Sequence, residues 1–244
     1  MIGTAGWSIP AQHAGAFPEE GSHLQRYSRV FSAVEINTSF YRPHRPSTYE
    51  RWAGTVPAGF RFAVKMPKEI THARRLVQAE EPLVRFLGEI RSLGDKLGPV
   101  LVQLPPSLAF KADLAGFFRD LCTRFGGAVA CEPRHRSWFT DEVDQLLGEL
   151  HIARVAADPD LVPRAGAPGG WTGLRYYRLH GSPRMYYSAY PRESLAALAR
   201  RLTGQAGVTW CIFDNTAEGA AAHDAMALAD LLAQAREGDC ASPR

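Results

Sequence analysis

The sequence predicts a single (β/α)8 barrel of the TIM type, and three observations support that prediction. Short β-branched or apolar runs alternate with segments whose apolar residues recur at helical spacing, which is the pattern of repeated βα units. Eight such units can be counted in 244 residues, the usual size of a closed eight-unit barrel. No glycine fingerprint follows the first strand, which argues against the alternative of an open doubly wound sheet.

The predicted strands are rich in β-branched, aromatic or small apolar residues and are bounded by turn-forming residues. They cover residues 2–7, 33–37, 60–65, 99–104, 128–132, 153–158, 175–180 and 208–215. Helical apolar stripes lie between them at 83–90, 114–121, 143–150 and 195–202. Ser47 and Glu50 have the spacing of a capping box, and Thr140 is expected to cap the helix that follows it.

The segment after the sixth strand does not fit the repeating pattern. Residues 159–173, PDLVPRAGAPGGWTG, contain closely spaced prolines and glycines that a regular crossover helix does not tolerate. We therefore expect an irregular crossover there. No change in composition divides the chain, so we expect one barrel domain over 1–236 and a frayed tail at 237–244.

Composition narrows the class of protein. The net charge of +3 is too small to indicate nucleic-acid binding by itself, and a hydrophobic share of 45% is enough for a core. The opening residues, MIGTAGWS, do not resemble a secretory leader, and no stretch reaches the length of a membrane span, so we expect a cytoplasmic protein. The cysteines lack zinc-site spacing, and we expect reduced thiols and no cofactor; they are Cys122, Cys131, Cys211 and Cys240.

Alternation along the strands predicts which polar side chains face the barrel interior. Val34 and Ile36 suit the helix layer, so Glu35 and Asn37 share the inward parity. The same reasoning places further polar groups inward or at the carboxyl ends of strands, where barrel active sites form. These groups are Lys65, Glu132, Arg134, Asp158, Arg178, His180, Asp214 and Asn215.

Four predicted loops at that end mix arginine or histidine with aromatic residues. They are TSFYRPHRP, KEITHARRL, PRHRSWF and GSPRMYYSAY. Guanidinium groups bind phosphate or carboxylate, and aromatic faces stack on bases or sugars, so the loops suggest a ligand rim. The alternative is structural: the charged groups neutralise one another as a plug, and each arginine packs over a surface aromatic.

Seven blocks of sequence resemble, in order and over nearly the whole chain, the domain of unknown function 72 family, the YecE-like TIM-barrel proteins. The blocks are GTAGWS, VEINTSFYRP, FRFAVKMPKEITHARRL, LGDKLGPVLVQLPPS, CEPRHRSWF, YYRLHGSPRMYY and FDNTAEG. The resemblance implies the barrel fold and supplies no settled activity. This chain differs from the usual form of the family at Pro133, where an aromatic residue is common, and at Asp214, where asparagine is common.

The first functional hypothesis is a metal-free acid/base enzyme, or at least a binding site, for an anionic and phosphate-bearing compound. Glu35, Lys65, Glu132 and His180 are its candidate catalytic residues. The matching blocks and the rim supply candidate substrate-binding residues, which are Trp7, Asn37, Tyr41, His72, Gln103, Arg134, His135, Trp138, Arg178, Tyr187 and Asn215. Glu35 and Glu132 also suit glycoside hydrolysis, depending on their separation.

A divalent-metal phosphodiesterase or isomerase is the second hypothesis. Its candidate ligands are Glu35, Glu132, Asp158, His180 and Asp214. The interleaved Lys65, Arg134 and Arg178 argue against it, because they repel a cation.

Three further alternatives remain open from the sequence. Lys65, at the end of an apolar strand, has the setting of a Schiff-base lysine, although neighbouring carboxylates are expected to keep it charged. The aromatic and basic rim also suits a module that binds single-stranded nucleic acid without catalysis. Residues 181–188, GSPRMYYS, form either a mobile lid or a packed rim loop.

Overall fold

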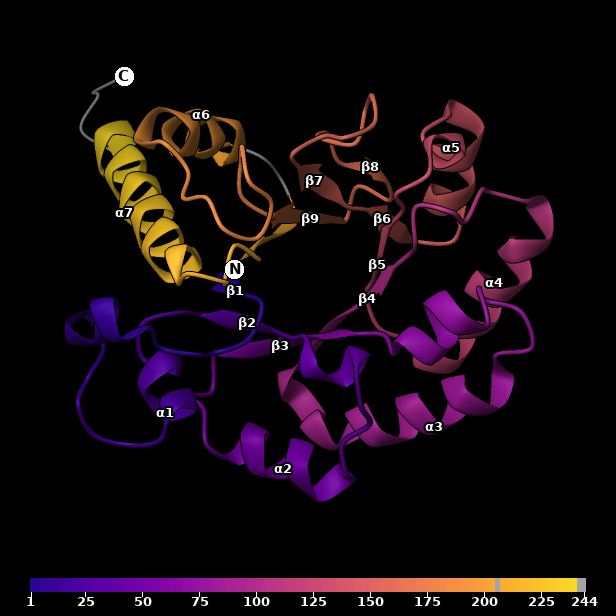
Figure 1. Cartoon of the computed structure of the whole chain (residues 1–244), viewed down its shortest axis with the longest axis horizontal. Coiled ribbons are helices and arrows are strands. Elements are labelled where there is room, and N and C mark those ends of the chain that lie inside the picture. The colour runs from indigo at the N-terminus through magenta and orange to yellow at the C-terminus, as the bar shows by residue number, and fades with distance from the viewer. Residues whose placement is uncertain (205–206, 241–244) are drawn as a thin grey trace.

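The computed structural model describes residues 1–204 and 207–240, with side chains up to 235, and shows a ring of mostly parallel strands surrounded by helices (Figure 1). The strands are β1 (Ile2–Thr4), β2 (Ala33–Ile36), β3 (Arg61–Lys65), β4 (Leu97–Gln103), β5 (Val129–Glu132), β6 (Ile152–Arg154), β7 (Ala156–Asp158), β8 (Gly169–Gly170), β9 (Leu174–Leu179) and β10 (Val208–Phe213). The predicted α/β barrel is confirmed.

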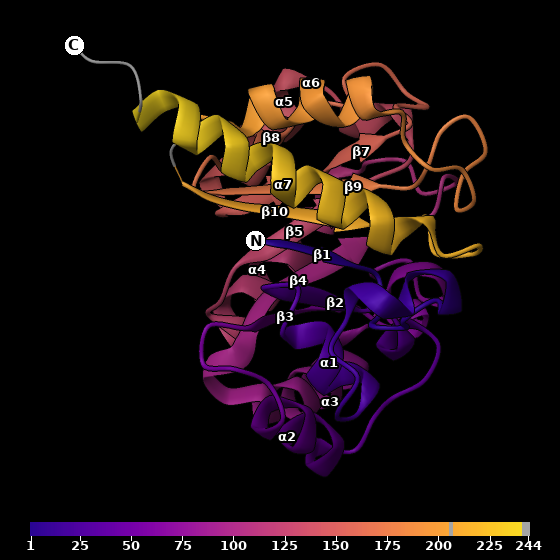
Figure 2. The same cartoon turned by 90° about the vertical axis from the view of Figure 1, so that its left-hand side faces the viewer.

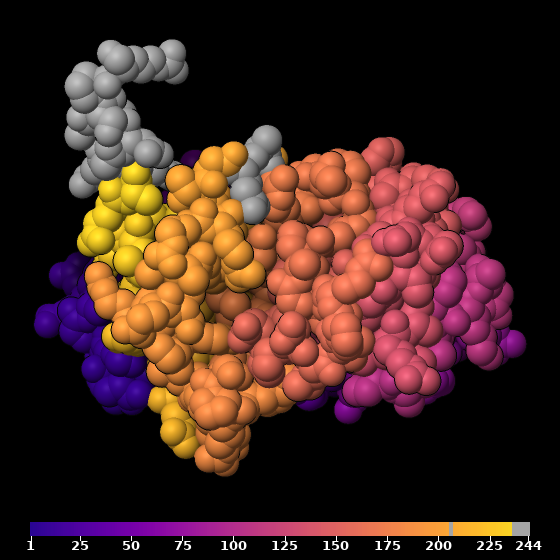
Figure 3. Space-filling view, turned by 90° about the horizontal axis from the view of Figure 1, so that it is seen from above, coloured from indigo at the N-terminus to yellow at the C-terminus, as the bar shows by residue number. Residues whose placement is uncertain are grey.

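The helices occupy the positions between the strands. The α-helices are α1 (His23–Ser28), α2 (Pro46–Gly54), α3 (Glu80–Ile90), α4 (Ala115–Phe125), α5 (Asp141–Glu149), α6 (Arg192–Leu202) and α7 (Ala220–Cys240). The 3-10 helices are η1 (Ala11–Ala16), η2 (Thr38–Phe40), η4 (Arg91–Lys96), η5 (Ala112–Leu114) and η6 (Arg136–Trp138), and η3 (Glu69–Ala73) is a π-helix. Figure 2 shows α6 and α7 beside β9 and β10, with α1, α2 and α3 on the opposite side of the strands. In the view from above, residues of the second half of the chain form the centre of the visible face, and earlier residues are visible at its sides (Figure 3).

The ring is formed by two sheets that meet at two seams. One sheet has the order β1-β10-β9-β7 and the other β2-β3-β4-β5-β6-β8. At the first seam the predicted sixth strand changes sheets: β6 pairs with β5, and β7, which begins two residues after β6 ends, pairs with β9. At the second seam, Ala5 and Glu35 form a bridge, and Gly6 N donates to Glu35 O at 2.9 Å. The ring therefore closes through one shared strand and one short contact.

The hydroxyl of Tyr27 in α1 explains why the second seam has so few strand hydrogen bonds. It accepts from Thr4 N at 2.8 Å and donates to Ala33 O at 3.1 Å, so it bridges β1 and β2. The strands also approach closely here, because a Cβ atom built on Gly3 would lie 2.0 Å from Ala33 O. Only glycine fits at this position of the ring.

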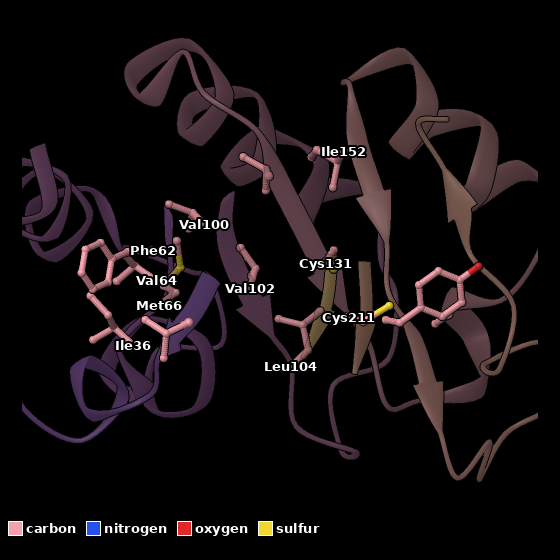
Figure 4. Packing of buried hydrophobic residues seen from close by; sticks show 14 of the residues in the cluster. Ile36, Phe62, Val64, Met66, Val100, Val102, Leu104, Cys131, Ile152 and Cys211 are labelled. Atoms are coloured by element: carbon pink, nitrogen blue, oxygen red, sulfur yellow. The ribbon is translucent and has the colours of Figure 1, made fainter. Parts of the chain in front are cut away.

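Two buried clusters show which strand residues face the interior. The interior cluster contains small residues of the first strands and larger ones of the last, namely Ala33, Ala63, Leu101, Ala130, Ala153, Val155, Leu174, Tyr176, Trp210 and Ile212. The outer cluster, between strands and helices, contains Val34, Ile36, Val129 and Cys131. Ile36 and Cys131 are labelled in Figure 4. The inward parity expected for Glu35 and Glu132 is therefore confirmed.

Local expectations had mixed outcomes. The capping box at Ser47 and Glu50 is wrong: α2 begins at Pro46, whose fixed φ suits the first helical turn, after Arg45 as N-cap. Thr140 does cap α5, accepting from Val143 N at 3.3 Å. Residues 159–173 contain turns, bends and the short β8, so the irregular crossover is confirmed.

The carboxyl end of the chain was predicted less fully. The helix α7 follows β10 and was not among the predicted helices. The expected tail at 237–244 lies partly outside the described residues, because α7 continues to Cys240 and 241–244 are not described. Among the helices of 1–204 and 207–240, none combines the length and apolarity that crossing a membrane requires.

We predict that Tyr27→Phe destabilises the protein by about 1–3 kcal/mol, because Thr4 N and Ala33 O lose their partner in a buried place. Urea unfolding followed by circular dichroism measures the change. Tyr41→Phe is the matched control, since Tyr41 is 65% exposed. Equal stability of the two variants would show that the hydroxyl does not hold the seam together.

Candidate functional site

The guanidinium of Arg178 is the centre of the polar groups inside the barrel. Arg178 projects inward from β9 and is fully buried. Its Nε and Nη2 donate to the two carboxylate oxygens of Glu35 at 3.1 and 2.7 Å. Nη1 donates to Glu132 Oε2 at 2.7 Å, and Nη2 also to Asp214 Oδ2 at 2.9 Å. One cation thus binds carboxylates from β2, β5 and the residue after β10.

His180 lies one layer nearer the carboxyl ends of the strands and touches the same carboxylates. Its Nδ1 is 3.1 Å from Asp214 Oδ2, and its Nε2 is 3.0 Å from Glu132 Oε1. Arg134 Nη2 lies 2.8 Å from His180 Nε2 and also forms an ion pair with Glu132 Oε1. With the proton on Nδ1, the ring donates to Asp214 and accepts from Arg134.

Two carboxylates of this network, those of Glu132 and Asp214, are held in their ionised form. Burial opposes the charge of Glu132, but Arg178, Arg134 and His180 outweigh it and hold its pKa well below the usual range. Burial likewise opposes the charge of Asp214, and Arg178 and His180 lower its pKa. Glu132 is therefore ionised at neutral pH and is not a proton donor there, which argues against its expected role as a proton carrier.

Lys65 has a different environment from the other charged groups. It ends β3, is 5% exposed, and its Nζ has no hydrogen bond or ion pair with the residues that the structure describes. The Phe40 ring lies against the amine, with its centroid 4.3 Å from Nζ. Burial, with a smaller contribution from Arg178, lowers the pKa of Lys65 although the three carboxylates raise it. The carboxylates act on Lys65 in the expected direction, towards the charged form, although Arg178 rather than Lys65 is their ion-pair partner.

Unsatisfied polar atoms gather at the same end of the barrel. Among the described side chains, the buried polar atoms without a hydrogen-bond partner are Asn37 Oδ1, Tyr49 Oη, Arg134 Nε and Asn215 Oδ1. Asn37 directly follows β2, Arg134 follows β5, and Asn215 follows β10. Buried polar atoms normally have partners, so three such atoms at one end of a barrel indicate a place for a ligand or water.

The segment 181–190 covers His180. The ring of Tyr186 lies edge-on, with its centroid 5.7 Å from that of His180, and Tyr186 has a positive φ of 70°. Its backbone N–H donates to His180 O, and its carbonyl accepts from Ala217 N. In this structure the segment is therefore a packed loop over the mouth.

A pocket of about 560 Å³ opens beside the mouth, between residues 39–43 and α3. Tyr41 and His72, both expected to bind substrate, line it together with Phe40. Phe40 separates this rim pocket from Lys65, since the same side chain lines the pocket and contacts Nζ. Burial and the charge of Lys65 lower the pKa of His72.

Several expected site residues have structural surroundings instead. Trp138 is fully buried and donates from Nε1 to Leu108 O at 2.8 Å, so it belongs to the core. His135 accepts from Ser137 N as the N-cap of η6. Trp7 packs edge-on against Trp52, with ring centroids 4.9 Å apart.

The remaining expected residues are divided between the strands and the rim. Gln103 ends β4 and pairs in register with Glu132, next to the network. Tyr187 lines a second pocket, of about 440 Å³, and Arg184 lies 3.7 Å from its ring centroid. Asp158 lies apart from the network, because its Oδ1 accepts from Tyr190 Oη at 2.8 Å.

The donor set does not favour the divalent-metal alternative. Arg178 fills the space between Glu35, Glu132 and Asp214 and binds all three. Asp158 is committed to Tyr190, as above. Within the described side chains, no group of three or more acidic, histidine or cysteine residues is arranged to hold a metal ion.

Three residues of the site were not predicted. Tyr176, fully buried, donates to Glu35 Oε2 at 2.9 Å, and the alternation that identified Arg178 also identifies it. Asp224 in α7 accepts from Asn215 Nδ2 at 2.7 Å, which required knowledge of that helix. Phe40 lies under Lys65 because η2 turns the chain after β2, and the sequence has no local signal for that contact.

Comparison with known proteins assigns the chain to a family. The model of the family described as "Protein of unknown function DUF72" matches residues 1–244. The chain belongs to the DUF72 family. The YecE protein of Escherichia coli (strain K12) is 33% identical over 142 residues, which is 55% of this chain and 52% of YecE. The chain spans about half the length of the curated relatives that it matches.

Solved structures agree with this assignment. A DUF72 family protein of Thermotoga maritima MSB8 has a TM-score of 0.78 at 25% identity, covering 95% of this chain and 98% of its own. One from Enterococcus faecalis V583 has a TM-score of 0.80 at 21% identity, covering 95% and 94%. A D-psicose 3-epimerase has a TM-score of 0.55 at 10% identity, covering 97% and 99%, and shows likeness of fold alone.

We predict that Glu35→Gln lowers the free energy of unfolding by about 3–5 kcal/mol, because it removes one partner of a buried ion pair. Guanidinium unfolding at pH 7 measures the loss. The control is Glu50→Gln, which removes an exposed carboxylate on α2 and should change stability little. Loss of the same size in both variants would contradict the central role of the Arg178 network.

We also predict that acid destabilises the protein through this network. The folded-state pKa of Glu132 and of Asp214 is depressed, so their stabilising contribution is complete above the unfolded-state values of about 3.9–4.3 and is lost as pH falls below them. Unfolding free energies measured from pH 7 to pH 3 should fall below about pH 4.5. Glu132→Gln should show a shallower fall, and an unchanged slope would contradict the assignment.

Proposed function

We propose that the barrel mouth binds a small anionic ligand, of which a phosphorylated compound is the expected type. The observation that supports this most directly is the group of unsatisfied buried atoms, Asn37 Oδ1, Arg134 Nε and Asn215 Oδ1, at the carboxyl ends of the strands. A buried polar atom without a hydrogen-bond partner costs free energy, and a hydrogen bond from a ligand or water offsets that cost. These atoms offer both donors and acceptors to a polar guest.

The charges at the mouth favour an anion over a cation. Glu35 and Glu132 are at most 1% exposed at their side chains, and Arg178 binds them below the mouth. The Arg134 side chain remains 11% exposed and keeps an unsatisfied Nε donor, and Lys65 has no carboxylate partner among the residues that the structure describes. Arg134 is thus the most exposed charged group of the network, and a guanidinium binds phosphate or carboxylate oxygens. The Asp214 side chain is 7% exposed, but Arg178 binds its carboxylate.

Access to the mouth requires the loop 181–190 to move. Its attachment is polar and local: Tyr186 is joined to His180 and Ala217 by backbone hydrogen bonds, and Asn215 Nδ2 donates to Ser188 O. Tyr186 is 41% exposed, so little apolar area holds its ring in place. Opening such a loop and closing it over a bound anion would exclude water from the site.

The network suits acid/base chemistry only in part. Glu132 and Asp214 stay ionised, so they act as fixed negative charges that orient Arg134 and His180. His180 is the remaining proton carrier of the proposed mechanism, because its ring nitrogens contact Asp214 and Glu132 at the mouth and imidazole is the commonest general acid or base. We therefore assign proton transfer in any turnover to His180 or Lys65 rather than to Glu132 or Asp214.

The proposal predicts that inorganic phosphate binds the protein and that Arg134→Gln and Lys65→Met each weaken binding by about tenfold or more, as expected for loss of a charge-assisted contact worth about 1.5–3 kcal/mol. Isothermal titration calorimetry measures the affinities. Arg119→Gln, an exposed guanidinium of α4, is the matched control and should bind like the parent.

The binding experiment can contradict the proposal in two ways. The first is equal affinity in all four proteins, which would place the phosphate elsewhere. The second is displacement of phosphate by single-stranded oligonucleotides with a strong salt dependence, which favours the nucleic-acid alternative.

A further inference from the structure

We propose that Lys65 is a carbonyl-reactive amine that forms an imine with a small aldehyde or keto compound carrying a carboxylate or phosphate. This inference rests on the proposed anion site, because Arg134 would hold the anionic group while Lys65 meets the carbonyl carbon. The evidence is the placement of Lys65, the absence of a partner for its amine in the described part of the chain, and the contacts of its neighbours.

The placement of Lys65 follows from its strand. Lys65 is the last residue of β3, in register with Leu101 of β4, and Leu101 belongs to the interior cluster. Its amine therefore lies on the inner side of the ring, at the end where ligands of such barrels bind. The charges of Arg178, Glu35, Asp214 and Glu132 all act on it, which places it beside the network.

A second lysine shows what an ordinary buried amine does in this protein. Lys96 is 8% exposed, about as buried as Lys65, yet its Nζ donates to Ala58 O at 2.7 Å and lies 3.4 Å from Asp95. The buried amine of Lys96 thus has both a hydrogen-bond acceptor and a nearby carboxylate. Lys65 has no such partner among the described residues, and its lowered pKa increases the share of neutral amine, which is the form that attacks a carbonyl.

Arg178 explains why carboxylates so near to Lys65 do not pair with it. The guanidinium takes both oxygens of Glu35, Oε2 of Glu132 and Oδ2 of Asp214. Burial and Arg178 then lower the pKa of Lys65, which increases the neutral fraction of the amine. The Phe40 ring opposes this effect in part, because an aromatic face favours the ammonium form.

The proposed step is an ordinary condensation. The lone pair of neutral Nζ attacks the carbonyl carbon, a C–N bond forms, and the electrons of the C=O double bond move to oxygen, which takes one proton from nitrogen. The nitrogen then loses its second proton and forms the C=N bond while the C–O bond breaks. The oxygen leaves as water with both amine hydrogens, so no oxidant or reductant is needed.

The test uses the full chain, glyoxylate as the anionic aldehyde, and cyanoborohydride to reduce any imine to a stable carboxymethyl amine. The sequence has only four lysines, Lys65, Lys68, Lys96 and Lys111, so peptide mass spectrometry resolves each of them. We expect Lys65 to be modified at least about tenfold faster than Lys68 and Lys111 at neutral pH, because its lowered pKa increases the neutral fraction of the amine. Its rate should also level off at a lower pH.

Matched variants identify the contributions. Lys65→Arg keeps the positive charge and should abolish this adduct without changing the other three, whereas Lys96→Arg should leave the modification of Lys65 unchanged. Arg134→Gln should slow labelling by glyoxylate but not by formaldehyde, a smaller aldehyde that lacks an anionic group. Unfolding curves of each variant confirm that it is folded.

The outcomes separate this inference from the proposed anion site. If phosphate binds the parent protein but Lys65 is modified by neither aldehyde faster than Lys68, the reactive amine is refuted and the anion site stands. If Lys65 reacts rapidly with formaldehyde while glyoxylate has no advantage and phosphate does not compete, the anionic class of substrate is refuted.

Discussion

The site depends on one buried guanidinium. Arg178 and the carboxylates of Glu35 and Glu132 have side chains that are at most 1% exposed, so their charges have lost nearly all hydration and are stable only together. Interior residues of an ordinary barrel are apolar. The interior cluster of this barrel is also apolar and includes Ala63, Leu101 and Ala130. The ion network occupies the next layer up and fixes the positions of His180 and Arg134. Everything at the mouth is arranged around that layer.

The same interaction divides the charged residues into two kinds. Groups that Arg178 binds have partners and act through their positions and charges. Within the described residues, Lys65 Nζ forms no ion pair, and Arg134 Nε has no hydrogen-bond partner. A guanidinium can do this because it presents several donors in a plane, so one cation occupies carboxylates that would otherwise pair with a lysine amine. The availability of Lys65 is thus a consequence of the commitment of Arg178.

Strand alternation was the part of the sequence that carried most information. It identified the inward faces at Glu35, Glu132 and Arg178, because side chains of a half-apolar strand have only two directions to take. Sequence could not show which carboxylate binds which cation, since that depends on the register of strands far apart in the chain. The sequence also led us to expect Trp138 in the binding site, whereas it belongs to the core. A core aromatic and a binding aromatic can have the same local sequence.

The two seams between the sheets have a consequence for how the molecule folds. Glu35 and Glu132 belong to the six-stranded sheet, whereas Arg178 and Asp214 come from the four-stranded sheet and the residue that follows it. The earlier sheet therefore contains acidic groups that stay in contact with water until a later segment of the chain supplies their counter-charge. Assembly of the ring is for this reason cooperative between its two sheets. A nascent chain that ends before residue 178 lacks the guanidinium that neutralises Glu35 and Glu132.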